Sequence, residues 1–304
     1  MAAQTERTRG PVKVHRTGRG RGPAKVIRSR PVTATKANVL GGLGSLAWLA
    51  IVAVPLYWIV ITSFRTQQGF FGDNPLAFPT NPTLDNYRTV LANDFGRYLT
   101  NSFIVTLSAV ALIVATGYLC AYTIARSPNK KTRAMFNVML LGLAIPLQAT
   151  IIPIYLMIVK AGLYDNLLAI ILPSVAFALP ITVLILVNFL RDIPIALYEA
   201  MRIDGASGWQ VMTQLAIPLS RPAIATVAIY SGLNIWNGFL FPLILTQSPG
   251  TRVLPLALTS YQGMFTINVP AIIAAVVLSS LPIIALYVLG RRQLVAGMTA
   301  GFGK

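Results

Sequence analysis

Charged side chains are scarce in this chain: lysine, arginine, aspartate and glutamate together make up 11% of its 304 residues. A soluble domain of this length carries about 25% charged residues. Apolar residues account for 55%, which leaves too few charges to cover a globule in water. The low charge therefore excludes an ordinary soluble domain and predicts a surface that faces an apolar medium.

Histidine and cysteine are nearly absent, since His15 and Cys120 are the only residues of their types. A single cysteine forms no intrachain disulfide and no metal cluster. One histidine in the N-terminal tail supplies neither a Cys–His nucleophile pair nor a Ser–His–Asp triad. We therefore expect this chain to contain no catalytic residues and no metal site.

A phosphate-binding loop of the pattern G-x-x-x-x-G-K-[ST] is also missing, because the only Gly-Lys pair is Gly303-Lys304. We expect no cofactor on this chain, and we expect any ATP that drives it to bind a different polypeptide.

Ion-coupled transporters keep ionisable groups inside their spans. The eight acids fall instead in the tail, in predicted loops or at helix ends, which disfavours proton coupling but leaves carbonyl-built sodium sites open.

Six apolar runs are long enough for transmembrane helices, which need about 20 residues to cross a hydrocarbon core of ~30 Å. They cover roughly residues 43–63, 102–125, 135–159, 166–190, 222–246 and 270–290. Prolines interrupt several runs, at positions 146, 153, 173, 180 and 242. Neighbouring helices in a bundle can satisfy the backbone groups that a proline frees. A membrane β-barrel would need short segments of alternating polarity, which these runs lack. The sequence thus predicts an all-α membrane protein with six transmembrane helices.

Lysines and arginines are distributed unevenly over the loops. Ten lie in residues 1–38, four follow the second run, three follow the fourth and three lie at the C-terminal end, whereas five lie in the opposite loops. Loops rich in Lys and Arg stay in the cytoplasm. Because an even number of spans puts both termini on one side, we expect both termini to be cytoplasmic.

The net charge of +17 raises the alternative of a nucleic-acid partner. Most of the excess lies in residues 1–38, which are rich in Arg, Gly, Pro and Thr and have no hydrophobic periodicity. Such a segment beside a membrane acts as a topology signal and contacts lipid headgroups. We interpret residues 1–38 as a disordered cytoplasmic tail and residues 39–304 as the membrane domain, with the lipid bilayer and no nucleic acid as partner.

The most informative segment follows the fourth run, where residues 191–224 read RDIPIALYEAMRIDGASGWQVMTQLAIPLSRPAI. Pro194 suits the first turn of a helix over residues 195–204, and Gly205 is placed to end that helix. We expect Gly205 in the left-handed conformation, which costs a residue with a Cβ about 1–2 kcal/mol. The chain is therefore predicted to turn sharply at Gly205.

A second short helix is predicted from Trp209 to Leu215, before Pro218 and Pro222 lead into the fifth run. The two helices would form a compact helix–turn–helix at the membrane face. Small residues would keep it slim enough to enter a groove on a partner, and acids would offer charges for docking. These residues are Ala200, Gly205 and Ala206, and Glu199 and Asp204.

The same segment resembles the EAA loop of bacterial ABC importer permeases, whose pattern is Glu-Ala-Ala, three residues, Gly, then about nine residues to Ile-x-Leu-Pro. The matching residues are Glu199, Ala200, Gly205, the Asp204-Gly205-Ala206 run of sugar-importing members, and Ala216-Ile217-Pro218. Met201 and Ile217 depart from the usual Ala and Leu but stay apolar. Other stretches resemble the maltose-type branch: NSFI at 101–104, IPLQ at 145–148, WNGFL at 236–240 and GMTAG at 297–301.

This resemblance, over roughly residues 40–304, implies the ABC importer permease fold and a subunit that moves a sugar or oligosaccharide across the inner membrane of a prokaryote. It implies as partners a cytoplasmic ABC ATPase dimer that binds the ATP, a second related permease subunit, and an extracytoplasmic sugar-binding protein. Coupling to the ATPase would fall on the 191–222 loop, at Glu199, Ala200, Met201, Asp204, Gly205, Ala206 and Pro218. The chain itself would perform no covalent chemistry.

Polar residues inside the runs are candidates for the translocation path. Asn234 and Asn237 lie i, i+3 on one helical face, with Trp236 beside them. Amides bond sugar hydroxyls, and an aromatic ring stacks on the apolar face of a sugar. The alternative is that the two amides join neighbouring helices. Gln148 and Asn188 are further candidates for the path.

The resemblance also implies a binding-protein contact in the loop 247–269 and an ATPase contact after Arg292. The alternative for that loop is a segment half-sunk in the membrane interface, with Tyr261 and Phe265 at headgroup level. Two alternative functions stay open at this point. The first is a permease of the same superfamily for another solute, such as a polyamine, phosphate or glycerol phosphate; an anionic solute would favour Lys or Arg in the spans, which have none. The second is an intramembrane enzyme, which would need a catalytic constellation, or an assembly scaffold, which would need no pore.

Overall fold

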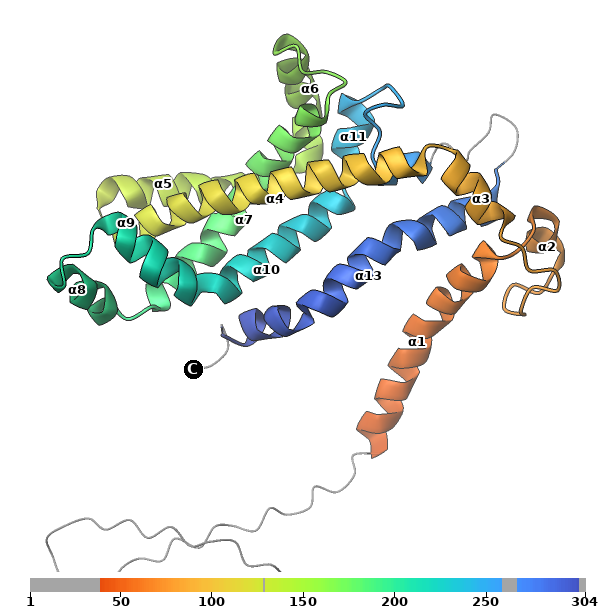
Figure 1. The fold of residues 1–304 in the computed structure, drawn as a ribbon, viewed down its shortest axis with the longest axis horizontal. Coiled ribbons are helices and arrows are strands. Elements are labelled where there is room, and N and C mark those ends of the chain that lie inside the picture. The colour runs from red at the N-terminus through yellow and green to blue at the C-terminus, as the bar shows by residue number, and fades with distance from the viewer. Residues whose placement is uncertain (1–38, 128, 259–266, 301–304) are drawn as a thin grey trace, which may run out of the picture. The chain divides into compact units, whose positions relative to one another are not determined.

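The computed structural model describes residues 39–127, 129–258 and 267–300, so the predicted tail 1–38 lies outside the described residues. The described elements are helices joined by turns and loops (Figure 1), which confirms the all-α class for this part of the chain. Met1–Ala50 and Ile51–Lys304 are two compact units, and each is described by itself. The described part of the first unit is the beginning of α1 (Val39–Ser63).

Two short helices follow α1 that the sequence did not predict, α2 (Gln67–Gly72) and α3 (Asp85–Ala92). Arg65, only 1% exposed, organises the segment between them. Its guanidinium donates to the carbonyls of Asn74 and Pro75 at 2.7 and 3.2 Å. Backbone carbonyls therefore take the place of a carboxylate in meeting the cost of burying this charge.

The most extensive helix pair joins α4 (Phe95–Arg126) to α7 (Leu167–Asp192). α4 contains the predicted span 102–125, and α7 covers the predicted span 166–190 except for its first residue, which caps the helix, so both are confirmed as continuous helices. A Cβ built on Gly117 of α4 would lie 2.6 Å from Cγ2 of Thr182 in α7. The missing side chain at Gly117 is thus what allows the two helices to approach so closely, as small residues do in membrane bundles.

The prolines inside α7 do not end it. Asn166 caps the helix by accepting a hydrogen bond from the backbone N–H of Leu168 at 2.9 Å. Pro173 and Pro180 then lie within the helix, which continues to Asp192. This agrees with the expectation that a bundle tolerates prolines that would end a helix in water.

The third predicted span, 135–159, is wrong as a single straight helix. The chain forms α5 (Lys130–Leu141), η1 (Gly142–Ala144), η2 (Leu147–Thr150) and α6 (Ile151–Lys160). The halves on either side of the break are bent by 96°. Pro146 causes the bend, because a proline disfavours the helical conformation of the residue before it, and Ile145 is extended with φ −80° and ψ 114°.

The fifth predicted span, 222–246, is also divided. α10 (Ile217–Trp236) ends before a non-helical segment at residues 237–239, and α11 (Leu240–Leu245) follows. Pro242 explains the division, since inside a continuous helix its ring would clash with the carbonyl four residues earlier. In the first turn of a new helix it meets no such obstacle.

Two further helices complete the second unit, α12 (Leu254–Ala257) and α13 (Val269–Ala300). The sixth predicted span, 270–290, lies within α13. In Figure 1 α10 runs between α4 and α13, and it packs against both and against α7. The residues Tyr261 and Phe265, predicted at headgroup level, lie outside the described residues.

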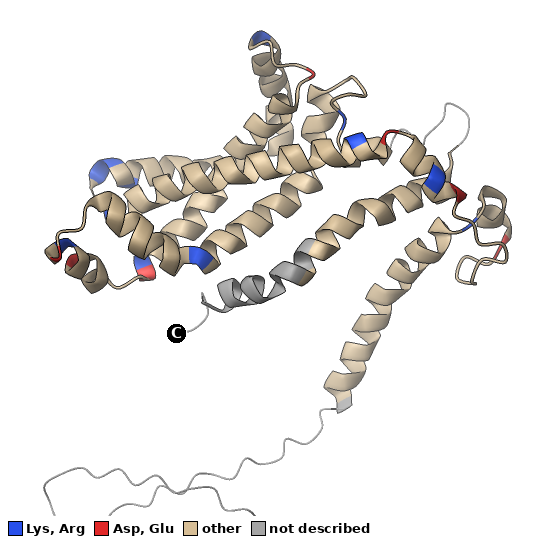
Figure 2. Ribbon diagram, in the orientation of Figure 1, with Lys and Arg blue, Asp and Glu red and all other residues tan. Residues whose placement is uncertain are grey.

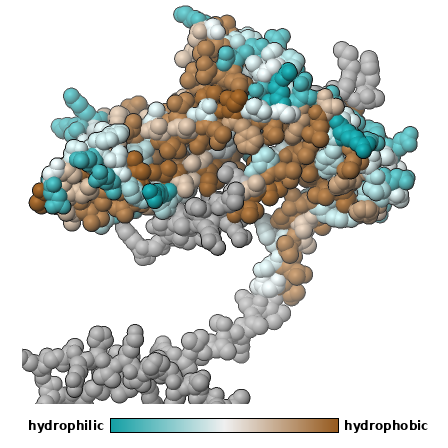
Figure 3. Space-filling model, in the orientation of Figure 1, coloured by the Kyte–Doolittle hydropathy of each residue, from teal (hydrophilic) through white to brown (hydrophobic). Residues whose placement is uncertain are grey.

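By length and composition, three described helices could cross a membrane: Leu40–Ser63, Phe95–Arg126 and Leu167–Asp192. The bent pair Lys130–Ala144 and Leu147–Lys160 would make a fourth. Apolar residues cover the middle of α4 and its neighbours in Figure 3, whereas hydrophilic residues gather toward the helix ends. Large side chains such as Leu107 and Ile152 are 63% and 71% exposed, as expected of a surface that faces lipid.

Candidate functional site: the 191–222 loop and the cavity between α7 and α10

Charged residues lie toward the ends of the helices in Figure 2, and one group of them lies where α4 and α7 end. The loops after these two helices lie together, because Arg126 of α4 contacts both Leu190 of α7 and Tyr198 of the following loop. Seven described basic residues and three acids belong to this end: Arg126, Lys130, Lys131, Arg133, Arg191, Arg202 and Arg221, with Asp192, Glu199 and Asp204. The bodies of α4 and α7 between their terminal turns carry no charge.

The 191–222 loop begins with α8 (Ile195–Ile203), close to the helix predicted over 195–204. Gly205 follows with φ +85°, so the left-handed conformation expected there is confirmed. The backbone N–H of Ala206 donates to the carbonyl of Met201, and that of Gly205 to the carbonyl of Arg202, at 3.0 and 3.1 Å. These two bonds define a Schellman motif, which ends the helix without orphaned carbonyls.

The second half of the loop differs from the prediction. A separate short helix from Trp209 to Leu215 is not formed; α9 (Gly208–Gln210) continues through the π-helical segment η3 (Val211–Ala216) into α10. Ser207 caps this long helix in a capping box with Gln210. The N–H of Ile217 reaches back five residues to Met212. This wider turn lies directly before Pro218, which has no N–H to contribute, so the proline does not interrupt the helix.

The loop exposes most of the residues predicted to couple to an ATPase. Glu199, Ala200, Asp204 and Gly205 are exposed, whereas Met201, Ala206 and Pro218 are half-buried. Neither acid takes part in an ion pair among the described residues. Two large apolar side chains are exposed beside them, Ile203 at 85% and Trp209 at 67%.

Tyr198 is the one buried residue of α8 and is 5% exposed. The guanidinium carbon of Arg126 lies 3.7 Å from the centroid of its ring. The Arg126 side chain also donates to the carbonyl of Leu190. Burial raises the pKa of Tyr198, and the neighbouring Arg126 opposes that rise. Sequence reasoning missed this contact, because its partners are far apart in the chain.

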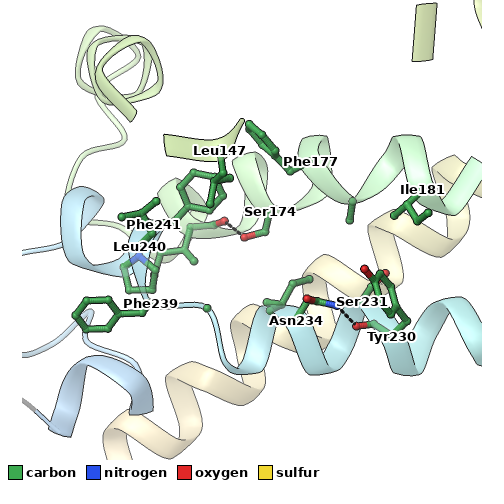
Figure 4. Close-up of a pocket in the computed structure, with 15 residues that line it drawn as sticks. Leu147, Ser174, Phe177, Ile181, Tyr230, Ser231, Asn234, Phe239, Leu240 and Phe241 are labelled. Atoms are coloured by element: carbon green, nitrogen blue, oxygen red, sulfur yellow. Dashed lines mark hydrogen bonds between the residues drawn. The ribbon is translucent and has the colours of Figure 1, made fainter. Parts of the chain in front are cut away.

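A cavity of about 310 Å³ lies between α7, α10 and the segment that joins α10 to α11. Figure 4 shows Asn234, Ser231 and Tyr230 of α10 on one side and Ser174 and Phe177 of α7 on the other. Its lining is mainly apolar and aromatic with a few polar groups, which is the usual composition of a small-molecule site.

Three polar side chains of this cavity differ in their hydrogen bonds. Ser174 donates to the carbonyl of Ile170 at 2.7 Å, and Asn234 donates to the carbonyl of Tyr230 at 2.8 Å. Ser231 is 1% exposed, and its hydroxyl has no hydrogen-bond partner. The oxygen of the Asn234 amide and the hydroxyls of Ser231 and Tyr230 are therefore polar side-chain groups of the cavity that have no hydrogen-bond partner among the described residues.

The other residues predicted for the path lie elsewhere. Asn237 lines a second cavity, of about 320 Å³, together with Trp236. Trp236 is 7% exposed, packs edge-on against Phe103 at 5.0 Å and donates to the carbonyl of Ser279. The Asn237 amide, just after the end of α10, donates to the carbonyl of Leu233 in that helix at 2.8 Å. Asn234 and Asn237 thus line different cavities.

Gln148 and Asn188 are exposed and line neither cavity. Gln148 belongs to η2, beyond the bend at Pro146, although its neighbour Leu147 does line the first cavity. Asn188 lies in the last two turns of α7, close to the 191–222 loop. The structure thus brings only Asn234, of the predicted path residues, to the cavity between α7 and α10.

At the opposite ends of α4 and α7 a carboxylate organises the loop after α11. One oxygen of Asp165 accepts hydrogen bonds from the backbone N–H groups of Gln247 and Ser248 at 2.8 and 3.0 Å, and from the Thr251 hydroxyl at 2.6 Å. These bonds, that of Gln247 first, hold the pKa of Asp165 well below its usual range. Asp165 itself has φ +58°. We call this arrangement the Asp165 clasp.

Two residues of α4 hold the same loop from its other side. The Asn101 amide donates to the carbonyls of Gly250 and Arg252, both at 2.8 Å. The Ser102 hydroxyl accepts from the backbone N–H of Leu254 at 2.8 Å. The described part of the predicted binding-protein contact, the loop 247–269, is therefore fixed by side chains on both sides.

Comparison with known proteins gives consistent matches. The sequence model of one family, described as "Binding-protein-dependent transport system inner membrane component", matches residues 91–299. The diacetylchitobiose uptake system permease protein NgcG of Streptomyces coelicolor is 34% identical over 259 residues, 84% of this chain and 85% of the relative. The sulfoquinovosyl glycerol transport system permease protein SmoH of Agrobacterium fabrum is 33% identical over 249 residues, 81% of this chain and 87% of the relative.

The fold matches a solved structure as well. A chain of a bacterial ABC transporter involved in the import of the acidic polysaccharide alginate superimposes with a TM-score of 0.72 at 20% identity. The match covers 85% of this chain and 98% of that one. The chain therefore shares the overall fold of this ABC transporter chain.

Proposed function

Because the chain belongs to the family of inner membrane components of binding-protein-dependent transport systems, we propose that it is the permease subunit of an ATP-driven importer of a sugar or oligosaccharide. The single observation that carries this proposal is the 191–222 loop. It pairs an exposed helix, ended at a left-handed glycine, with the family's Glu199, Ala200 and Gly205 at the family's spacing.

The substrate class follows from two lines of support. Relatives named for diacetylchitobiose and sulfoquinovosyl glycerol uptake carry sugar-containing compounds. The cavity between α7 and α10 offers the Asn234 amide and the Ser231 hydroxyl beside the rings of Phe177 and Tyr230. That mixture suits the hydroxyl groups and the apolar faces of a sugar, and the lining of the cavity contains no Lys or Arg.

Within this proposal the chain spans the inner membrane six times, with its α8 end in the cytoplasm. The spans are α1, α4, the bent pair α5–α6, α7, the pair α10–α11 and α13. The seven described basic residues at the α8 end support this orientation. The loop after α11, fixed by the Asp165 clasp, then faces outward, toward a binding protein.

The proposed partners are a cytoplasmic ATPase dimer that binds the ATP, a second permease subunit and the binding protein. The chain binds no cofactor itself and has no ATPase site. Ile203, Glu199 and Trp209 form the exposed part of the loop that would enter a cleft on the ATPase. Met201 and Ala206, half-buried behind them, join the loop to the core.

Gly205→Val in the reconstituted importer tests the proposal. No atom lies within 4 Å of a Cβ placed at Gly205, so the substitution meets no clash inside the chain. It does force a β-branched residue into a left-handed conformation, at about 1–2 kcal/mol or more. We expect normal membrane insertion but a roughly tenfold or greater loss of both sugar uptake and substrate-stimulated ATP hydrolysis in proteoliposomes, because strain of this size displaces the helix end.

Gly208→Ala is the matched control, because a Cβ at Gly208 also meets open space and Gly208 begins a helix with ordinary φ. Uptake by Gly208→Ala should stay near that of the unaltered chain. Full ATPase stimulation and uptake in Gly205→Val would contradict the role assigned to this loop.

A further inference from the structure

The attachment of α8 to the rest of the molecule is narrow. Every residue of α8 except Tyr198 is exposed or half-buried. Tyr198 belongs to the main hydrophobic core, together with Ile193 before it and Val211 after it. A movement of α8 therefore reaches the core through few groups: the buried Tyr198 side chain, the half-buried Met201 and the two backbone connections.

We propose that Arg126 is a positioning residue that joins α8 to the ends of α4 and α7, so that a displacement of α8 moves the helices that line the cavity. Its guanidinium covers the Tyr198 ring at 3.7 Å and donates to the carbonyl of Leu190, while its backbone ends α4. One residue of α4 thus contacts both α7 and α8 through its side chain. We call these three residues the Arg126 joint.

The half-buried guanidinium of Arg126 is stabilised by these contacts and not by an ion pair with any described residue. No carboxylate lies within ion-pair distance of Arg126 among the described residues, and its Nε is buried without a hydrogen-bond partner. The face of an aromatic ring attracts a cation through its quadrupole, most strongly where water is excluded. The Tyr198 hydroxyl, by contrast, is buried without a hydrogen-bond partner and adds no bond to the joint. The ring of Tyr198 and the cation of Arg126 are therefore the groups that matter.

A path from the joint to the cavity is present in the same helices. α4 and α7 pack closely along their length, as the contact of Gly117 with Thr182 requires. α7 then contributes Ser174 and Phe177 to the cavity. Packed helices move as rigid elements, so a shift at Leu190 is passed along α7 to this wall.

The test rests on the proposed function and measures sugar imported per ATP hydrolysed in proteoliposomes with the partner ATPase, second permease and binding protein. Arg126→Met and Tyr198→Leu each remove half of the contact while keeping apolar bulk. We expect each to lower the ratio about tenfold, within the range of a desolvated cation–π contact. Tyr198→Phe keeps the ring and should leave the ratio unchanged. Arg126→Lys keeps the charge without the planar fork and should fall between.

The double variant Arg126→Met/Tyr198→Leu separates a shared contact from two independent ones. If the two residues act together, the double variant lowers the ratio no further than either single variant. If both activities fall in step with abundance while the ratio stays constant, the residues serve folding alone and the proposal is overturned. Equal loss in Tyr198→Phe and Tyr198→Leu would overturn it too.

A second measurement makes the joint testable without transport. Hydrogen exchange on the purified permease should rise about tenfold at the α8 amides in Arg126→Met and stay unchanged in Tyr198→Phe. Unchanged α8 exchange in Arg126→Met overturns the joint itself. If the unaltered complex showed no ATP-driven uptake while α8 exchange rose as expected, the proposed function would be wrong and the coupling role of Arg126 with it, but the contact would stand.

Discussion

The two ends of the α4–α7 pair hold their loops by different physical means. At one end the Asp165 clasp, Asn101 and Ser102 fix the loop after α11 with hydrogen bonds of 2.6 to 3.0 Å. At the other end α8 is held by a guanidinium over a ring and a small apolar contact area. The loop after α11 is held by hydrogen bonds, which depend strongly on their angle, whereas α8 is held by a cation–ring contact, which depends less on it.

This difference bears on what each loop can do. Hydrogen bonds weaken steeply when their angle falls below about 120°, so the loop after α11 has one well-defined position. A cation over the face of a ring is attracted at distances up to about 6 Å from the centroid, so Arg126 and Tyr198 can stay in contact through a small tilt of α8. The comparison therefore teaches that the loop after α11, the proposed contact of a binding protein, is held rigidly, whereas α8, the proposed contact of an ATPase, can tilt about the Arg126 contact.

The largest expected effect comes from breaking the directional end with Asp165→Ala. The substitution leaves the N–H groups of Gln247 and Ser248 and the Thr251 hydroxyl without their acceptor. Hydrogen bonds to charged groups contribute about 1.5–3 kcal/mol. We expect the local opening free energy of this loop to fall by about 3 kcal/mol, which raises amide exchange at Gln247 and Ser248 roughly 100-fold.

Asp94→Ala is the matched control for the backbone part of this effect. Asp94 also has a positive φ, +55°, but its carboxylate makes only an exposed ion pair with Arg97 at 3.7 Å. The control should cost about 1 kcal/mol, mostly from the left-handed backbone. Equal costs at the two positions would mean that the clasp adds nothing, and the contrast between the two ends would collapse.

A smaller effect is expected from Ser102→Ala at the same end. The Ser102 hydroxyl accepts from the buried N–H of Leu254, and removing it costs about 1–2 kcal/mol. The exchange of the Leu254 amide should rise roughly tenfold. Thr100→Ala is the control, since the exposed Thr100 hydroxyl bonds only to Gly96 within its own helix. If Ser102→Ala loosened α8 as well, the two ends would not be independently held.

Sequence reasoning succeeded where the signal was local. α4 and α7 follow from long apolar runs, and α8 with its turn follows from Pro194 and Gly205, whose conformational preferences act on their own neighbours. The bend at Pro146 and the break before Pro242 were missed for the opposite reason. A proline in a membrane helix is sometimes accommodated, as Pro173 is, and sometimes not, and neighbouring helices decide which.

The Asp165 clasp and the Arg126 joint could not be predicted, because the residues that form each of them are far apart in the sequence. Arg126 meets Tyr198, and Asp165 meets Gln247, across many residues and through packing that no local pattern encodes. Arg126 was counted only as one positive charge of a cytoplasmic loop. The single local hint at Asp165 is an acid in the turn before the Asn166 cap, and many exposed turns share that pattern.

The smallest expected effect is a difference between the two ends in how their amide exchange responds to low pH. The pKa of Asp165 lies below that of an unfolded aspartate, about 3.9, so the clasp contributes its full stability above that value. This contribution is lost as the pH falls through the unfolded pKa toward the folded one, by at most about tenfold in the opening equilibrium for each pH unit.

At neutral pH the exchange of Gln247 in Asp165→Asn should exceed that of the unaltered chain several-fold, because the neutral amide accepts more weakly. That ratio should stay constant from about pH 7 to about pH 5 and shrink from about pH 4 to about pH 3. The corresponding ratio for α8 between Arg126→Met and the unaltered chain should not change over the same range, since a guanidinium stays charged and burial keeps Tyr198 neutral. If the α8 exchange ratio shrank as the pH fell while the Gln247 ratio stayed constant, the contact that depends on pH would be the one at α8, and the assignment of the two contacts would be reversed.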